Sequence, residues 1–175
     1  MDKLIIEPMK GIGKILLGMT KTEVDECLQY YTEKYEITYA KNPLCYHTKG
    51  AIQSFFQLEY DFDGKVNFIQ IPSAIKDVLN CVFHNLDVFN TKTEELVEKI
   101  DKISNYDRYH RELGWTYYYP ELGLSFWRPN ILKESDMQEE WFKELEPSIQ
   151  EDEKRNLYFY LSSLFLSSSA VSGFQ

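Results

Sequence analysis

The sequence predicts an α+β fold made of two related halves, each with a strand, a helix and an antiparallel sheet. The tetrapeptide Thr-Lys-Thr-Glu of residues 20–23 recurs at residues 91–94, and a short apolar run precedes both copies. Apolar side chains at helical spacing follow each copy, and alternating segments follow these in turn. Strands outnumber helices, so we expect the helices to pack on one side of the sheet. The predicted halves are residues 1–75 and 76–175, around one shared core.

Both expected helices begin with the Thr-x-x-Glu pattern of a capping box. In this motif the threonine hydroxyl accepts a hydrogen bond from a helical N–H, and the glutamate accepts one from the threonine amide. We expect Thr20 and Glu23 to cap the first helix, and Thr91 and Glu94 to cap the second. The apolar spacing predicts one buried stripe per helix. The stripes are Val24, Cys27, Leu28 and Tyr31 in the first helix, and Leu96, Val97, Ile100 and Ile103 in the second.

An antiparallel hairpin is expected after each of these helices, because apolar and polar residues alternate on both sides of a turn signal. Residues 55–62 and 66–71 flank an Asp-Gly dipeptide, which favours a tight turn with positive φ at both central positions. Residues 115–119 and 122–127 flank a Pro-Glu turn in the second half. The sheet is therefore expected to consist mainly of antiparallel pairs.

A third helix is expected to begin at Ser135, where Gln138 completes another capping box, and to end before Pro147. Its predicted stripe is Met137, Trp141, Phe142 and Leu145. Residues 156–160 are expected to form the last strand, followed by a frayed serine-rich tail. Six serines dilute the uncharged segment of residues 157–174, so we favour this tail over a membrane anchor.

The composition is typical of one globular domain, with 175 residues, of which 43% are hydrophobic and 27% charged. The net charge of −9 opposes binding to a phosphate backbone, so we expect no nucleic-acid binding and favour a cationic partner. The first apolar run has three residues, too few for a secretory signal. Cys27, Cys45 and Cys81 show no CxxC spacing, which is typical of reduced thiols. We therefore expect a cytoplasmic protein that binds no membrane.

No sequence motif identifies a reaction. His47, His84 and His110 lie outside metal-ligand spacing, so we expect neither a metal nor a cofactor. Residues 61–64 begin like a calcium loop but lack its later ligands. Cys45 and His47 stand at alternate positions, so both would point to one face of a strand. No orienting group is identified for Cys45 and His47. A hydrolase with a dispersed site stays an alternative, but we favour a protein that is not an enzyme.

Residues 133–154 carry nine acidic residues against three lysines, a net charge of −6. Acidic runs are commonly solvated helix faces, but here Trp141 and Phe142 stand among the carboxylates. A tyrosine-rich segment precedes the run, and in a strand Tyr117 and Tyr119 share one face. Aromatic rings rimmed by charge are typical of protein–protein hot spots. The candidate partner-binding residues are Tyr117, Tyr119, Asp136, Glu139, Glu140 and Trp141.

Residues 13–24 read Gly-Lys-Ile-Leu-Leu-Gly-Met-Thr-Lys-Thr-Glu-Val. This segment resembles the opening of the helix-plus-sheet modules in β-lactamase-inhibitor-like proteins and small outer-membrane assembly lipoproteins, which are often tandem and bind other proteins. The second copy departs from the pattern, with Phe89-Asn90 in place of Gly18-Met19. A small, acidic, aromatic-rich chain of this kind is similar to immunity proteins of bacterial polymorphic-toxin and contact-dependent growth inhibition systems.

The resemblance implies an immunity protein that binds and neutralises one cognate toxin by occluding its active site. The acidic, aromatic-rich surface fits a basic toxin of the nuclease type, whose substrate groove must be cationic. A non-catalytic cytosolic adaptor or scaffold domain is the alternative, and a hydrolase is less favoured. A neighbouring gene that is lethal without this protein would distinguish an immunity protein from an adaptor.

Overall fold

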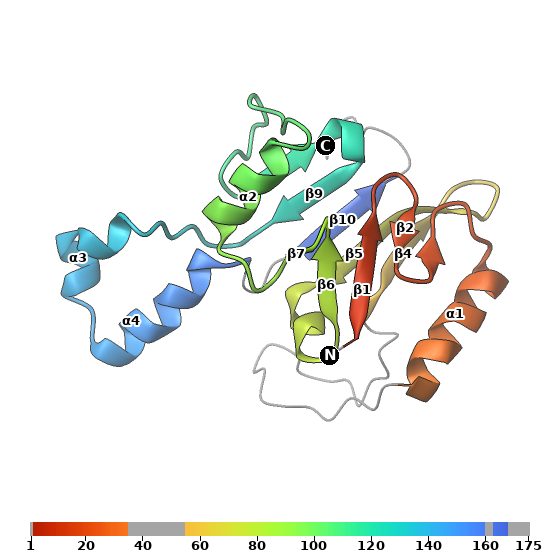
Figure 1. Cartoon of the computed structure of the whole chain (residues 1–175), viewed down its shortest axis with the longest axis horizontal. Helices are drawn as coiled ribbons and strands as arrows, with labels where there is room; N and C mark the ends of the chain where they lie inside the picture. Colours follow the sequence, from red (N-terminus) through yellow and green to blue (C-terminus); the bar gives the residue numbers. More distant parts are fainter. Residues whose placement is uncertain (1, 35–54, 160–162, 168–175) are drawn as a thin grey trace.

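The computed structural model describes residues 2–34, 55–159 and 163–167, and it confirms the expected α+β class (Figure 1). Two five-stranded sheets form the body. The helices do not clearly gather on one side of them. Helix α1 (Lys21–Lys34) and helix α2 (Thr93–Asp101) lie at different ends of the body, and two short helices stand away from it (Figure 1).

The first sheet has the order β3-β2-β1-β6-β7. Its central strands β1 and β6 are parallel, and the other pairs are antiparallel. The β1–β6 pair joins the start of one predicted half to the start of the other. The strands are β1 (Lys3–Glu7), β2 (Gly11–Ile12), β3 (Ile15–Leu16), β6 (Asn80–Phe83) and β7 (Leu86–Asp87).

The second sheet has the order β4-β5-β10-β9-β8, with every neighbouring pair antiparallel. Both expected hairpins are confirmed as β4–β5 and β8–β9. Strand β10 lies between them. The strands are β4 (Gln57–Tyr60), β5 (Val66–Pro72), β8 (Thr116–Tyr119), β9 (Leu124–Trp127) and β10 (Ser163–Ser167).

The position expected for the last strand is wrong. Lys154–Leu157 form a 3₁₀ turn, and β10 follows within the serine-rich segment expected to be frayed. Backbone hydrogen bonds to β5 on one side and β9 on the other hold β10. Such bonds are independent of side-chain hydrophobicity, so the serines did not signal a central strand.

One cluster of buried apolar side chains fills the body. It includes Leu4 and Val24 from the first predicted half and Leu96 and Phe126 from the second. Gly123 allows the β8–β9 turn to pack closely, because a Cβ there would lie 2.5 Å from the Ser167 carbonyl oxygen of β10. The division of the chain into related halves stays a prediction.

The first predicted capping box is confirmed. At the start of α1 the Glu23 N–H donates to Thr20 Oγ1 at 3.3 Å, and the Thr20 N–H donates to the Glu23 carboxylate at 2.7 Å. The hydrogen bonds from the Thr20 amide and hydroxyl lower the pKa of Glu23 below its ordinary value. Thr20 thus stabilises the helix start through two reciprocal bonds.

The second predicted capping box is wrong. Helix α2 begins at Thr93 with Lys92 at the N-cap, and no side chain caps it. The Thr91 hydroxyl donates instead to the Asp87 carbonyl oxygen at 2.6 Å. Thr20 and Lys92, the two N-cap residues, each form an isolated antiparallel bridge to a later segment. The N-cap of α2 therefore lies one residue after Thr91, the position that the repeated tetrapeptide predicts.

The tightest turn is not where the sequence predicts it. In the β4–β5 connection Gly64 has a φ of 71°, but Asp63 does not have a positive φ. The Asp61 carboxylate accepts the N–H groups two and four residues later, which closes a wider loop. A turn with two successive positive φ values occurs between β6 and β7, at His84 (45°) and Asn85 (66°).

The predicted third helix is wrong in its start and length. Asp136–Gln138 form a 3₁₀ turn, α3 spans only Glu140–Lys143, and α4 spans Pro147–Glu153. The Asp136 carboxylate accepts the Lys133 N–H at 2.8 Å, which favours a local turn over a helix start at Ser135. The predicted stripe of α2 also ends early, because Ile103 lies beyond the helix and is exposed.

We expect Thr20→Ala to lower the free energy of unfolding by about 1 kcal/mol, the usual cost of losing an N-cap. Thr22→Ala is the control, since Thr22 is exposed inside the helix. Because the pKa of Glu23 is lowered in the folded state, the cap stabilises above the unfolded pKa and is lost as the pH falls through the folded pKa. Urea unfolding at neutral and acidic pH should show the gap between Thr20→Ala and the native protein shrinking on acidification. An equal gap at both pH values contradicts the role of the carboxylate.

Candidate protein-binding surface

Residues 133–154 stand away from the two sheets as a projecting segment, which we call the acidic arm (Figure 1). It contains the 3₁₀ turn at residues 136–138 and helices α3 and α4. The chain enters the arm after β9 and returns from it before β10. The arm carries −6 of the chain's net charge of −9, so most of the net negative charge of the protein is concentrated there.

The arm is held to the body at Lys92, the N-cap residue of α2. The Lys92 ammonium forms an ion pair with Glu134, at the start of the arm. The Lys92 backbone forms an antiparallel bridge with Tyr158, just beyond the arm's end. The hydrogen bond to Glu134 and the charge of that carboxylate raise the pKa of Lys92. Both ends of the arm therefore meet at the N-terminal end of α2.

The Trp141 side chain lies at the surface of the arm and packs against its buried neighbour, Phe142. The Phe142 side chain is 3% exposed, yet it lies outside the main apolar cluster of the body. Its ring contacts the Trp141 ring edge-on, with centroids 5.5 Å apart. The Trp141 side chain is 49% exposed. Phe142 thus fixes one side of the indole while the other side stays open to a partner.

The acidic residues predicted to bind a partner have two different roles. Glu139 and Glu140 are exposed, as the prediction requires. Asp136 is half-buried, and its carboxylate accepts hydrogen bonds from the Lys133 N–H at 2.8 Å and the Ser135 hydroxyl at 3.3 Å. Asp136 therefore shapes the turn before α3, and its carboxylate is already partly satisfied.

Four exposed glutamates of the arm form no ion pair with any residue in the part of the chain that the structure describes. They are Glu139, Glu140, Glu144 and Glu146. The arm's central lysine does not neutralise them, because the Lys143 ammonium donates to the Gln138 carbonyl oxygen. This part of the arm therefore presents an uncompensated negative field.

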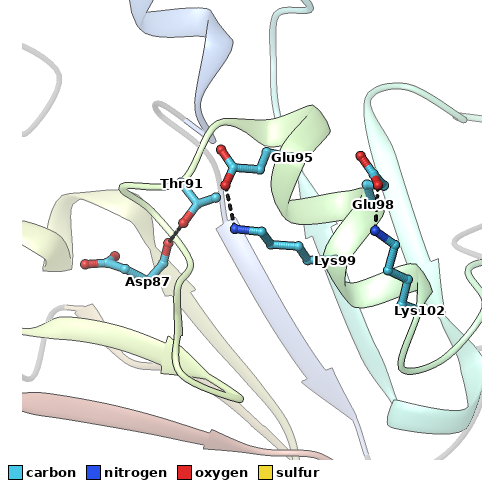
Figure 2. A network of polar contacts seen from close by, with 6 residues as sticks. All are labelled: Asp87, Thr91, Glu95, Glu98, Lys99 and Lys102. Atoms are coloured by element: carbon cyan, nitrogen blue, oxygen red, sulfur yellow. Dashed lines mark hydrogen bonds and ion pairs between the residues drawn. The ribbon is translucent and has the colours of Figure 1, made fainter.

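Helix α2 shows the opposite arrangement. On its outer face Glu95 pairs with Lys99 at 2.5 Å and Glu98 pairs with Lys102 at 2.7 Å, each one helical turn apart (Figure 2). Two of the acidic residues of α2 are therefore neutralised by lysines one turn later, while the four glutamates of the arm are not. A cationic partner gains more by approaching the arm than by approaching α2.

The tyrosine part of the predicted surface is wrong for one residue. Tyr119 is 0% exposed, and its hydroxyl donates to the Val97 carbonyl oxygen of α2 at 3.5 Å, so its ring cannot contact a partner. Tyr117 is half-buried and packs edge-on against Tyr106 and Phe159. Burial raises the pKa of Tyr117. Both tyrosines share a face, as alternation predicts, but α2 covers that face.

Other exposed aromatic side chains lie away from the predicted residues. Phe62 is fully exposed in the β4–β5 turn, at the far end of the body from the arm (Figure 1). Trp115 is 48% exposed just before β8. The sequence offered a signal for Phe62, an aromatic residue between two aspartates in a turn, which we interpreted only as a turn.

Neither cysteine among the described residues is an activated thiol. Burial raises the pKa of both Cys27 and Cys81, which keeps these thiols protonated. No group of three or more metal-ligating side chains forms within residues 2–34, 55–159 and 163–167. In the same residues no helix has both the length and the apolar character needed to span a bilayer. Cys45 and His47, the candidate hydrolase pair, lie outside the described residues.

Comparison with known proteins finds no match of any kind: no protein-family model, no curated protein and no solved structure is similar to the chain. The resemblance of residues 13–24 to β-lactamase-inhibitor-like modules therefore stays a prediction. The similarity to immunity proteins also stays a prediction.

The negative field around Trp141 can be measured by ionic fluorescence quenching. Two double variants leave one tryptophan each: Trp115→Phe with Trp127→Phe leaves Trp141, and Trp127→Phe with Trp141→Phe leaves Trp115. With quenching constants normalised to free N-acetyltryptophanamide, we expect Trp141 to be quenched more by caesium than by iodide, because the arm attracts cations and repels anions. Trp115, which has nearly equal exposure, should show a smaller bias. Equal bias at both positions contradicts a field local to the arm.

Proposed function

We propose that the protein is an immunity protein: a non-catalytic inhibitor that binds one cognate basic toxin and occludes its active site with the acidic arm. The observation that carries this proposal is the half-exposed Trp141 ring beside four glutamates that form no ion pair within the described residues, all on a projecting arm. An aromatic anchor within a charged rim is the usual anatomy of a protein–protein hot spot.

The charge of the arm fits a toxin whose substrate is a nucleic acid. A nuclease groove must be cationic to bind phosphates, so an acidic segment can occupy it in place of the substrate. Complementary charge also raises association rates to about 10⁸–10⁹ M⁻¹s⁻¹ at low salt. Fast capture matters for an inhibitor of a toxin that acts at low copy number. An arm that stands away from the body can reach into a concave groove, which a flat sheet face cannot do.

The proposal includes a cytoplasmic location, where such a toxin would act on its substrate. An adaptor domain that binds another cytosolic protein through the same arm is the alternative. The discriminating experiment expresses each neighbouring gene in a naive host with and without this protein. A neighbouring gene whose product stops growth alone but not when co-expressed supports the immunity proposal. Harmless neighbours throughout contradict it.

Charge reversal on the arm should slow association with the toxin. We expect the double variant Glu139→Lys and Glu140→Lys to reduce the association rate about tenfold at low salt, and to flatten its dependence on ionic strength. The matched control is Asp25→Lys with Glu26→Lys, two exposed acids of α1 that give the same change in net charge. Stopped-flow measurements with the purified toxin give both rates. Equal slowing by the two double variants contradicts the arm as the interface.

Removal of the Trp141 ring should weaken the complex after it has formed. We expect Trp141→Ala to cost about 2 kcal/mol of binding free energy, mostly as faster dissociation. Phe62→Ala is the control, since it removes an exposed aromatic ring at the far end of the body. Calorimetry or surface plasmon resonance gives the dissociation constants. Unchanged affinity of Trp141→Ala removes the indole from the interface.

A further inference from the structure

Arg128 is buried at the end of β9 with most of its guanidinium unpartnered. The side chain is 1% exposed and is the largest of the fully buried side chains. Its Nε donates to the Gly114 carbonyl oxygen at 2.9 Å. Nη1 and Nη2 are buried and have no hydrogen-bond partner among the described residues. Among the described residues, the exposed Glu94 carboxylate is the acidic group that acts on this guanidinium, with the Tyr117 hydroxyl beside it, but it forms no ion pair with Arg128. A buried charge without a paired counter-charge is unfavourable in a folded chain, so the guanidinium favours a closer anion.

Strand register places Arg128 on the face of the second sheet that α2 covers. Tyr117 of β8 pairs with Phe126 of β9, and the Arg128 N–H donates to the Trp115 carbonyl oxygen at 2.9 Å. Residues two apart in a strand share a face, so Arg128 continues the face of Phe126 and Tyr117. The guanidinium carbon lies 6.0 Å from the centre of the Tyr117 ring.

The N-terminal end of α2 lies over the same part of this face. The Tyr119 hydroxyl contacts the Val97 carbonyl oxygen, which places the middle of α2 over the start of the turn between β8 and β9. Thr93 lies one helical turn before Val97 in α2. Tyr117 lies two residues before Tyr119 in β8, closer to Arg128 in the strand register. Figure 1 shows α2 alongside β9, with the start of the helix at the end where the strand finishes. The first turn of α2 and the guanidinium therefore belong to one region.

The first turn of α2 adds further unsatisfied donors. No side chain caps the helix, and its first N–H groups carry the partial positive charge of a helix N-terminus. The Thr93 hydroxyl is 0% exposed and has no partner among the described residues. Glu94 and Glu95 also stand in this turn, but both are exposed, and Glu95 is paired with Lys99.

We propose that Arg128 and the first turn of α2 form a binding site for one small oxyanion, a carboxylate or a phosphate. Nη1 and Nη2 offer two parallel donors, which match two oxygens of such a group. The Thr93 hydroxyl supplies a further donor, and the partial positive charge of the helix start favours an anion there. The arm's connection begins directly after Arg128 and returns through Phe159, which packs on Tyr117, so the site lies at the root of the arm. This proposal does not rest on the proposed function.

The test compares thermal unfolding of the whole chain in sodium phosphate, sodium acetate and sodium chloride at equal ionic strength and neutral pH. We expect the Tm to rise by several degrees, and saturably, with phosphate or acetate relative to chloride, because a ligand of the folded state stabilises it by mass action. A response to phosphate alone or to acetate alone identifies the oxyanion class. A Tm that depends only on ionic strength overturns the proposal.

Two variants assign the effect to this site. Arg128→Met keeps a similar volume without the charge, so it is expected to fold and to lose the specific anion response. An undiminished response in Arg128→Met overturns the proposal. Glu94→Gln removes a carboxylate near the site and should strengthen anion binding, with Glu98→Gln as the control farther along α2. Lower stability and no anion response in Glu94→Gln would mean that Glu94 itself is the partner of Arg128, and also overturns the proposal.

Discussion

Strand β10 is the constraint on which the body depends. It pairs with β5 on one side and with β9 on the other, and these pairs make one sheet out of two hairpins. Without it β4–β5 and β8–β9 would be separate two-stranded units, which are marginally stable in water. The turn of the later hairpin is also fitted to β10, since Gly123 leaves no room for a Cβ against Ser167. Strand β10, which contains the last described residues of the chain, therefore joins the β4–β5 hairpin to the β8–β9 hairpin.

The acidic arm follows from how β9 reaches β10. Neighbouring antiparallel strands need only a short loop, but here residues 128–162 connect them. Phe159, near the end of this connection, packs in the buried apolar cluster, but the arm stands away from the sheets and can carry charge without burying it. Lys92 fixes its place by meeting both ends, through its side chain at Glu134 and its backbone at Tyr158. The arm's charge and its projection therefore have the same cause.

The sequence predicts what is set by near neighbours along the chain. The reciprocal bonds of Thr20 and Glu23 and the β4–β5 hairpin are confirmed, since each depends on residues close in sequence. The same tetrapeptide fails at α2, because the Thr91 hydroxyl has a competing acceptor in the Asp87 carbonyl. Strand β10 was missed, because its hydrogen bonds come from strands far away in the sequence.

In the candidate site, too, the features set by near neighbours in the sequence were predicted and those set by distant contacts were not. The clustering of carboxylates located the acidic arm, because solvated charge needs no tertiary partner. Trp141 was predicted both in the apolar stripe of the third helix and as a partner-binding residue, and it is exposed. Strand alternation placed Tyr117 and Tyr119 on one face, but it could not show that α2 covers that face. No sequence pattern indicated that Arg128 is buried, since an arginine next to a tryptophan at a strand end is normally exposed.

The buried positive charge of Arg128 and the negative charge of the arm lie close together at the root of the arm. Arg128 is buried there, and the negative arm begins a few residues later, at residue 133. The field of the arm opposes entry of an anion at Arg128, and a cationic partner that neutralises the arm removes this opposition. By linkage, an anion at Arg128 then strengthens the binding of that partner by the same factor. The two proposals together therefore predict that partner binding at the arm and anion binding at Arg128 are thermodynamically coupled through the root of the arm.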